Sequence, residues 1–410
     1  MIDFEKKLKK YADVAVRVGI NIQKDQILVI NAPIETADFV RLAAESAYEA
    51  GAKDVYIEWR DDIVSLLRFT HVSEETLQEV NMWKVKGFEE FAEKGAAFLS
   101  VAASDPELLK DIDPKRIAMA QKANSKAMEK FREYTQKGDV SWCVVSTPTK
   151  SWAKKVFELE NSEENVEKLW ESIFNVCRMN EVDPVKSWED HNKILKEKID
   201  YMNEKQFDRL IFKAKGTDIT LGMPENHVWV GGALKNNDGV EFIPNIPTEE
   251  IFSTPHKNRV DGIVSSTKPL VYGGNKIENF SLTFKEGKVV EVKAEKGQQI
   301  LQDLVNTDEG ASMIGEVALV PHNSPISNSN ILFYNTLFDE NASCHFAIGS
   351  SYPICIKNGQ KMNKEDFQNA GGNVSLTHVD FMIGSKDMTI EGITKSGESI
   401  FIFKNGNWNI

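Results

Sequence analysis

Two kinds of hydrophobic pattern divide the chain into two regions with different predicted structures. In the first region, short apolar runs alternate with segments of helical periodicity. Residues 26–31 (QILVIN) and 54–59 (DVYIEW) predict buried strands, and residues 37–50 between them carry apolar side chains at helical spacing. A strand, a helix and a second strand form a βαβ unit, whose strands are nearly always parallel. The alternation therefore predicts a parallel sheet.

The same alternation continues further along the chain. Residues 96–102 and 138–145 predict two more strands, separated by a helix that we expect to begin at Asp113-Pro114 and to run to about residue 136. Residues 151–203 have helical character throughout. We therefore predict an N-terminal α/β domain with parallel βαβ units over residues 1–205.

Beyond residue 207 the pattern changes to short β-type runs separated by turn clusters. Examples of these clusters are residues 236–239 (NNDG) and 404–406 (KNG). We predict an α+β, strand-rich C-terminal domain over residues 206–410, and the candidate chemistry lies in it.

Composition and charge exclude several classes of protein. The 410 residues include 49 Lys and Arg and 62 Asp and Glu, a net charge of −13, so no basic face is expected to bind nucleic acid. The apolar runs are far shorter than the ~20 residues that cross a bilayer, and no signal peptide begins the chain. Four cysteines without CxxC spacing favour a cytoplasmic protein with reduced thiols. The first region also lacks glycine-rich nucleotide motifs.

One histidine and one carboxylate occur two residues apart in a predicted strand. Residues 374–383 (VSLTHVDFMI) predict this strand, so His378 and Asp380 should project from the same face. Imidazole and carboxylate can both bind a divalent metal. The alternative is that Asp380 only hydrogen-bonds a structural histidine.

Other carboxylates and a second histidine strengthen the metal hypothesis. Glu316 lies within the apolar run 313–320 (MIGEVALV), where an unpaired carboxylate would be costly unless a cation compensates it or the strand is a solvated edge. His345 is surrounded by small residues, and Glu249-Glu250 lies between two prolines, although such a pair is most often a surface feature. No HExxH motif is present, and several carboxylates with two histidines suit a pair of divalent ions that share one carboxylate.

Four of these segments together resemble one family. Residues 248–252 (TEEIF), 315–319 (GEVAL), 339–345 (DENASCH) and 378–380 (HVD) are similar, in order and spacing, to the thermophilic-type metallo-aminopeptidases, the aminopeptidase T, aminopeptidase S and PepS group. The resemblance spans essentially the whole chain. It implies an N-terminal α/β domain, a C-terminal catalytic domain and a homodimer.

The resemblance also implies a two-metal site and assigns residues to it. Glu340 is a further ligand or a supporting carboxylate, and Tyr352 matches a tyrosine associated with the site. The implied metal ligands are Glu250, Glu316, His345, His378 and Asp380.

The expected activity is removal of N-terminal residues from short peptides that have a free N-terminus. Two divalent ions (zinc, cobalt, manganese or magnesium) would activate water, with Glu316 as the bridging ligand and Tyr352 donating to the developing oxyanion. Either Glu249 or Glu340 would transfer protons. The alternative is a non-catalytic metal- or small-molecule-binding protein of two domains, whose α/β domain carries the ligand.

Overall fold

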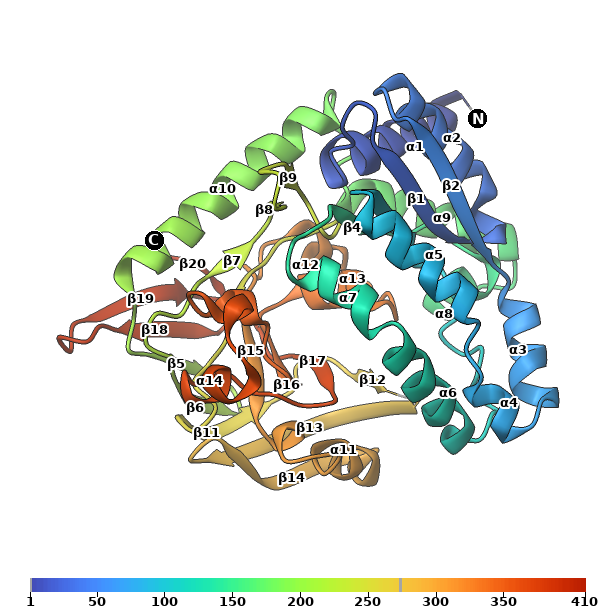
Figure 1. The fold of residues 1–410 in the computed structure, drawn as a ribbon. Helices are drawn as coiled ribbons and strands as arrows, with labels where there is room; N and C mark the ends of the chain where they lie inside the picture. The colour runs from blue at the N-terminus through green and yellow to red at the C-terminus, as the bar shows by residue number, and fades with distance from the viewer. Residues whose placement is uncertain (1, 273–274) are drawn as a thin grey trace. The chain divides into compact units, whose positions relative to one another are not determined.

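A computed structural model describes residues 2–272 and 275–410 of the chain (Figure 1). The chain forms two compact units. The first comprises Met1–Asn192, Ala233–Pro247 and Leu332–Leu337, and the second comprises Lys193–Gly232, Thr248–Ile331 and Phe338–Ile410. The division into domains of residues 1–205 and 206–410 stays a prediction.

The first unit contains a four-stranded sheet in the order β2-β1-β3-β4, and all three strand pairs are parallel. Its strands are β1 (Ile27–Pro33), β2 (Asp54–Arg60), β3 (Ala97–Val101) and β4 (Trp142–Val145). The short strands β8 (Leu234–Lys235) and β9 (Glu241–Phe242) form a separate hairpin. The parallel sheet confirms the βαβ prediction.

Helices cover both faces of this sheet because successive strand residues point to opposite sides. Val29 of β1 and Phe98 of β3 pack against Phe88 of α5 and Phe131 of α7, whereas α2 contacts β1 and β2. The helices of the region are α1 (Ile2–Val14), α2 (Ala37–Glu49), α3 (Asp62–His71), α4 (Glu74–Gln78), α5 (Met82–Glu93), α6 (Pro114–Ala127), α7 (Glu129–Gln136), α8 (Lys150–Phe157), α9 (Ser162–Val176) and α10 (Pro184–Lys205).

The helix expected from Asp113-Pro114 to about residue 136 is divided in two. Its start is as predicted, because the Asp113 side chain accepts a hydrogen bond from the backbone N–H of Lys115 and Pro114 takes the first helical position. At Met128 the backbone leaves the helical conformation (φ −86°, ψ 4°), and α7 begins at the next residue. No glycine or proline marks this break, so the sequence pattern did not reveal it.

The second unit contains two antiparallel sheets. The five-stranded sheet has the order β17-β16-β15-β10-β7, and the nine-stranded sheet has the order β12-β13-β11-β6-β5-β18-β19-β20, with β14 paired to β13. The strands of the five-stranded sheet are β7 (Val230–Gly231), β10 (Ile251–Ser253), β15 (Ile314–Leu319), β16 (His345–Gly349) and β17 (His378–Met382).

The other strands of this unit are β5 (Arg209–Ala214), β6 (Thr217–Gly222), β11 (Val260–Ser265), β12 (Leu270–Tyr272), β13 (Asn275–Lys285), β14 (Lys288–Lys296), β18 (Thr389–Ile393), β19 (Ser399–Lys404) and β20 (Asn407–Trp408). Its short helices are α11 (Gln298–Val305), α12 (Pro325–Ser329), α13 (Thr336–Asp339) and α14 (Lys364–Asn369).

The core of the second unit includes apolar side chains from both sheets. Phe346 of β16 meets Phe212 of β5 edge to face, with ring centroids 5.1 Å apart. Phe381 of β17 packs against Phe280 of β13 at 5.6 Å. One face of the five-stranded sheet is thus buried against the larger sheet, and its polar side chains lie on the other face. This strand-rich architecture confirms the predicted fold class.

None of the helices in residues 2–272 and 275–410 combines the length and the hydropathy needed to span a bilayer.

Candidate metal centre

Strand register brings most of the predicted ligands to one face of the five-stranded sheet. Glu316 of β15 lies opposite Ala347 of β16, which lies opposite Asp380 of β17. His345 and Ala347 are two residues apart, as are His378 and Asp380, so all project from the same face. Glu250 directly precedes β10, which pairs with β15. Residues far apart in the sequence therefore converge.

The strand predicted over residues 374–383 is shorter than expected. It covers only His378–Met382, although both candidate ligands lie within it. Before it, the Ser375 hydroxyl and the Leu376 N–H donate to the Asp308 carboxylate at 2.8 and 2.6 Å. These hydrogen bonds to a side chain that is distant in the sequence hold residues 375–376 outside the strand.

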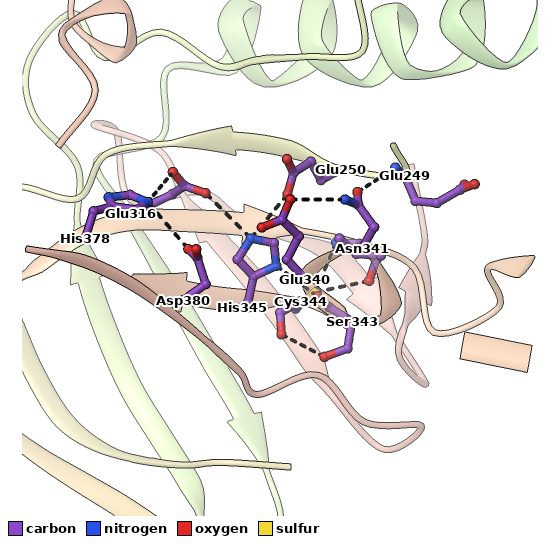
Figure 2. Close-up of polar contacts among 11 residues, drawn as sticks. Glu249, Glu250, Glu316, Glu340, Asn341, Ser343, Cys344, His345, His378 and Asp380 are labelled. Carbon is purple, nitrogen blue, oxygen red and sulfur yellow. Dashed lines mark hydrogen bonds and ion pairs between the residues drawn. The ribbon is translucent and has the colours of Figure 1, made fainter. Parts of the chain in front are cut away.

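The first cluster consists of Glu250, Glu316 and His345, all of which are buried (Figure 2). Nε2 of His345 lies 3.2 Å from Oε2 of Glu250 and 3.6 Å from Oε1 of Glu316. Oε2 of Glu250 is buried and has no hydrogen-bond partner in the described part of the chain. A buried carboxylate oxygen without a partner is costly, and a cation is the group that would satisfy it.

The second cluster consists of Glu316, His378 and Asp380. Nε2 of His378 lies 3.6 Å from Oε2 of Glu316 and 3.5 Å from Oδ1 of Asp380. Glu316 belongs to both clusters, with one carboxylate oxygen directed to each histidine (Figure 2). It therefore occupies the position of a shared ligand.

Backbone carbonyls fix the orientation of both histidines. Nδ1 of His345 lies 3.1 Å from the carbonyl oxygen of Ser343, and Nδ1 of His378 lies 2.7 Å from that of Ser350. A carbonyl oxygen can only accept, so each Nδ1 carries the proton. When the ring is neutral, Nε2 presents its lone pair to the carboxylates. This second hydrogen bond is the usual support of a metal-binding histidine.

The spacing of the donor atoms suits divalent ions. Ligand atoms about 2.1 Å from one ion at tetrahedral angles lie about 3.4 Å from one another. The four histidine–carboxylate pairs in the two clusters are separated by 3.2, 3.6, 3.6 and 3.5 Å. The side chains present therefore fit the metal that the sequence predicts.

The electrostatics also indicate that cations belong here. Burial, followed by the charges of Glu250 and Asp380, raises the pKa of Glu340 well above its ordinary value. Burial likewise raises the pKa of Glu316. Burial lowers the pKa of His345, but the nearby carboxylates of Glu250 and Glu316 outweigh it, and the net shift is strongly upward. Without a cation, the cluster binds protons instead.

A β-bulge at Gly315 places Glu316. The pairing of β15 with β16 shifts between Ile314 and Glu316, leaving Gly315 as the extra residue. A Cβ on Gly315 would lie 2.3 Å from the carbonyl oxygen of Gly349, so no larger residue fits there. Bulges of this kind change the direction of a neighbouring side chain and are frequent beside active sites.

Tyr352 and Glu340 lie beside the two clusters. The Tyr352 ring packs edge to face on His378, with centroids 4.9 Å apart, and the residue is 37% exposed. Although the residue as a whole is partly exposed, desolvation of its hydroxyl group and then the charges of Glu316 and Asp380 raise the pKa of Tyr352 well above its ordinary value, so the hydroxyl stays protonated. Glu340 is close enough to Glu250 and His345 for their charges to act on its carboxyl group, whereas the Glu249 side chain points away from them (Figure 2).

Asn341 is a residue near the site that the sequence did not suggest. It is fully buried, and its Oδ1 accepts the backbone N–H of Glu249 at 2.8 Å. Its Nδ2 lies 3.5 Å from Oε1 of Glu340, to which it donates. Asn341 thus links the backbone of Glu249, the residue before Glu250, to the side chain of Glu340. The link cannot be read from the sequence, because it joins two segments that are far apart in the chain.

Cys344 is adjacent to His345 but belongs to the opposite face of the sheet. It lies in the hydrophobic core of the unit, and its thiol donates to the carbonyl oxygen of Val320 at 3.3 Å. Burial raises its pKa to about 11. A cysteine nucleophile paired with His345 is therefore not part of this site.

Comparison with known proteins defines the class. Residues 4–408 match the family described as thermophilic metalloprotease (M29), and the chain belongs to this family. It is therefore a metal-dependent hydrolase that acts on peptides, which confirms the predicted enzyme class and the resemblance seen in the four motifs.

Particular relatives match the chain over its full length. Aminopeptidase AmpS of Bacillus subtilis (strain 168) is 53% identical over 408 residues, covering 100% of both chains. Aminopeptidase T of Thermus thermophilus is 41% identical and covers 99% of each. The solved structure of wild-type AmpT from Thermus thermophilus superposes with a TM-score of 0.94 at 40% identity, covering 99% of this chain and 100% of that one.

Proposed function

We propose that this protein is an aminopeptidase that hydrolyses the first peptide bond of short peptides by means of two divalent ions. The observation that carries the proposal is the position of Glu316, whose two carboxylate oxygens are directed to two separate ligand groups. A carboxylate shared in this way is typical of a pair of ions that act together.

Each ion has a set of protein ligands in this proposal. Glu250, His345 and Glu316 hold the first, and Glu316, His378 and Asp380 hold the second. Glu340 is a further ligand or a supporting carboxylate. The four carboxylates Glu250, Glu316, Glu340 and Asp380 carry a formal charge of 4 × (−1) = −4, which two divalent cations would balance. Carboxylate and imidazole ligands accept zinc, cobalt, manganese or magnesium.

Ions held there supply Lewis acidity, which makes water a usable nucleophile near neutral pH and polarises the scissile carbonyl. The side chains perform the remaining tasks. The protonated hydroxyl of Tyr352, next to His378, donates a hydrogen bond to the oxyanion as it develops. Glu340 takes a proton from the attacking water and delivers it to the leaving amine. We assign this role to Glu340 rather than to Glu249, whose side chain points away from both clusters (Figure 2).

A requirement for a free N-terminus is part of the proposal. A neutral α-amino group has a lone pair that a divalent ion held in this site would accept, and this contact would fix the position of the first peptide bond. An acetylated peptide lacks this amine and should resist cleavage. We also propose that the protein forms a homodimer and is located in the cytoplasm. The four cysteines are buried thiols that form no disulfide, as a reducing compartment would keep them.

Hydrolysis of a leucine arylamide, measured with and without a chelator, tests the proposal. The aminopeptidase should lose activity on chelation, regain it with added zinc, cobalt, manganese or magnesium, and reject the N-acetylated arylamide. Absence of hydrolysis under every metal would favour the alternative, a protein that binds metal without catalysis. Equal cleavage of the acetylated substrate would point to an endopeptidase.

A further inference from the structure

A cavity of about 560 Å³ lies in the first unit, at the carboxyl ends of its four parallel strands. Its walls come from the segments that follow each strand: Thr36 after β1, Asp62 after β2, Asp105 after β3 and Thr147 after β4. In the strand order β2-β1-β3-β4, the chain places β2 on one side of β1 and then β3 and β4 on the other side. The switch point of the topology therefore lies between β1 and β3. Open parallel sheets bind ligands outside the carboxyl edge at such a switch point.

One side of the cavity is apolar and largely aromatic. Leu8 and Phe39 are buried there, and the half-buried ring of Trp170 meets Phe4 edge to face with centroids 5.5 Å apart. The volume falls within the range of small-molecule pockets, roughly 300–1,000 Å³. An apolar group the size of a benzene ring suits this side.

The lining carries more negative than positive charge, which disfavours an anionic ligand. It includes four carboxylates, those of Glu35, Asp38, Asp62 and Asp105, and one ammonium group, that of Lys150. Asp38 is ion-paired with Arg41 at 2.7 Å, and Asp62 acts electrostatically on Arg60, so in the described part of the chain Glu35 and Asp105 are the lining carboxylates without a cation partner. Lys150 is itself ion-paired with Glu163 at 2.5 Å. A nucleotide phosphate would be repelled here, even though helix N-termini surround parallel-sheet edges. The lining favours a cation.

Two of these carboxylates share a wall. Asp62 and Asp105 are half-buried, and the backbone N–H of Asp105 donates to Oδ2 of Asp62 at 3.3 Å. Thr147, also in the lining, is 1% exposed, and its hydroxyl oxygen has no hydrogen-bond partner in the described residues. A buried hydroxyl without a partner is costly, and a donor brought by a ligand would satisfy it.

We propose that this cavity binds a primary ammonium group carried on an apolar body of aromatic size, as in a free amine or the N-terminus of a peptide. The ammonium group donates to Asp62, Asp105 and Thr147, and the apolar body packs against Phe39 and Trp170. The proposal does not depend on the aminopeptidase activity, since every lining residue belongs to the first unit and every candidate metal ligand to the second.

The probe is phenethylamine, and 3-phenylpropionate, with the same ring but a negative charge, is its matched control. Protein labelled with ¹⁵N at tryptophan reports through the indole N–H of Trp170, assigned by its absence in Trp170→Phe. At about 10 mM, a ligand with a Kd of about 1 mM occupies most sites. The Trp170 signal should shift with phenethylamine and not with phenylpropionate. Equal responses, or none, would overturn the proposal.

Variants test the polar contacts. Asp62→Asn should weaken phenethylamine binding about three- to tenfold, because it removes a half-buried charge. Asp54→Asn, at the exposed amino end of the same strand β2, is the control and should bind as wild type. Thr147→Val should bind phenethylamine about two- to tenfold more weakly, because the ligand loses a hydrogen-bond acceptor. Its unfolding temperature should be unchanged or higher, because the substitution removes a buried hydroxyl without a partner. Unchanged affinity in both Asp62→Asn and Thr147→Val would contradict the assignment.

A tripeptide that begins with D-phenylalanine, which resists hydrolysis, distinguishes the two sources of the ammonium group. A Trp170 shift with phenethylamine alone assigns the cavity to free amines, and a shift with both ligands extends it to peptide N-termini. Stronger binding of adenosine monophosphate than of phenethylamine would contradict the charge argument.

Discussion

Among single residues, Glu316 is the most important to the proposed function, because it is the one ligand that both ions would share. Outer-shell partners of metal ligands typically contribute 10–100-fold to activity, so a ligand shared by two ions should contribute more than about 100-fold. We expect the hydrolysis rate of Glu316→Gln to fall below about 1% of the wild-type rate. Its circular dichroism should be unchanged, because a buried charge has been removed from a cluster of like charges.

The exposed Glu398 provides the control, and Glu398→Gln should retain full activity. Near-wild-type turnover in Glu316→Gln would exclude a bridging role for this carboxylate.

Asn341 offers a second test at this scale. Asn341→Ala would leave the buried N–H of Glu249 without its acceptor, which costs about 1–3 kcal/mol of the free energy of unfolding. It would also release Glu340, so kcat should fall at least about tenfold with a smaller change in KM. Steady-state kinetics and denaturant unfolding measure both effects.

The matched control for this variant is Asn203, whose side chain makes two hydrogen bonds to the backbone of Trp229. Asn203→Ala should lose comparable stability and keep its kcat. If the two variants had the same kcat, the role of Asn341 would be purely structural.

At the scale of elements, three residues lie side by side in a row across neighbouring strands of the five-stranded sheet: Glu316, Ala347 and Asp380. The size of the middle side chain determines how much space the ions have. Ala347 stands between Glu316 and Asp380, and its methyl group leaves room above the strand. Ala347→Val should cost about 1–3 kcal/mol through overpacking and should abolish metal binding at this face. Ile348→Val, on the opposite face, should cost about 0.5–1.5 kcal/mol and leave metal binding intact. Calorimetric zinc titration of the two chelator-treated variants compares them.

Sequence reasoning recovered the parts of the site that follow from short-range rules. The two-residue spacing of His378 and Asp380 and the apolar surroundings of Glu316 indicated one strand face and a need for a cation. The bulge at Gly315, the row through Ala347 and the link through Asn341 depend on the pairing of distant strands. No local pattern contains that register, so these features emerged only from the fold.

In the fold, too, the features that follow from local sequence patterns were predicted and those that depend on distant contacts were not. Three strands of the parallel sheet were predicted to within two residues because each is an apolar run bounded by helices. The fourth, predicted over residues 138–145, begins only at Trp142. The break at Met128 and the shortened strand β17 were missed, since both result from backbone and side-chain contacts that periodicity does not record. The cavity of the first unit was also missed, because its lining comes from four separate loops without a recognised motif.

At the scale of the whole molecule, the bound ions should contribute to stability. Ligands that bind only the folded state raise its stability by mass action. Removing the ions would take away this contribution and leave the buried cluster around His345 to bind protons instead, and we expect the unfolding temperature to fall by several degrees. Differential scanning calorimetry before and after chelation measures this, and added metal should restore the original value. An unchanged unfolding temperature would argue against ions in this buried cluster.

Subunit association is the second property at this scale. We expect light scattering to report about twice the chain mass of 46.2 kDa, since a charge of −13 over 410 residues gives weak self-repulsion at physiological salt. Activity should decline as peptide substrates lengthen, if the site is partly enclosed in the dimer. A monomer that trims long and short peptides equally well would contradict both expectations.

The central claim is that two ions share Glu316. Anomalous diffraction from a crystal of the metal-loaded protein, recorded at the absorption edge of the added metal, tests it most directly. Two ions that share Glu316 should give two peaks, one beside Glu250 and His345 and one beside His378 and Asp380, separated by roughly 3.5–4 Å with Glu316 between them. A single peak, or peaks away from these side chains, would contradict it.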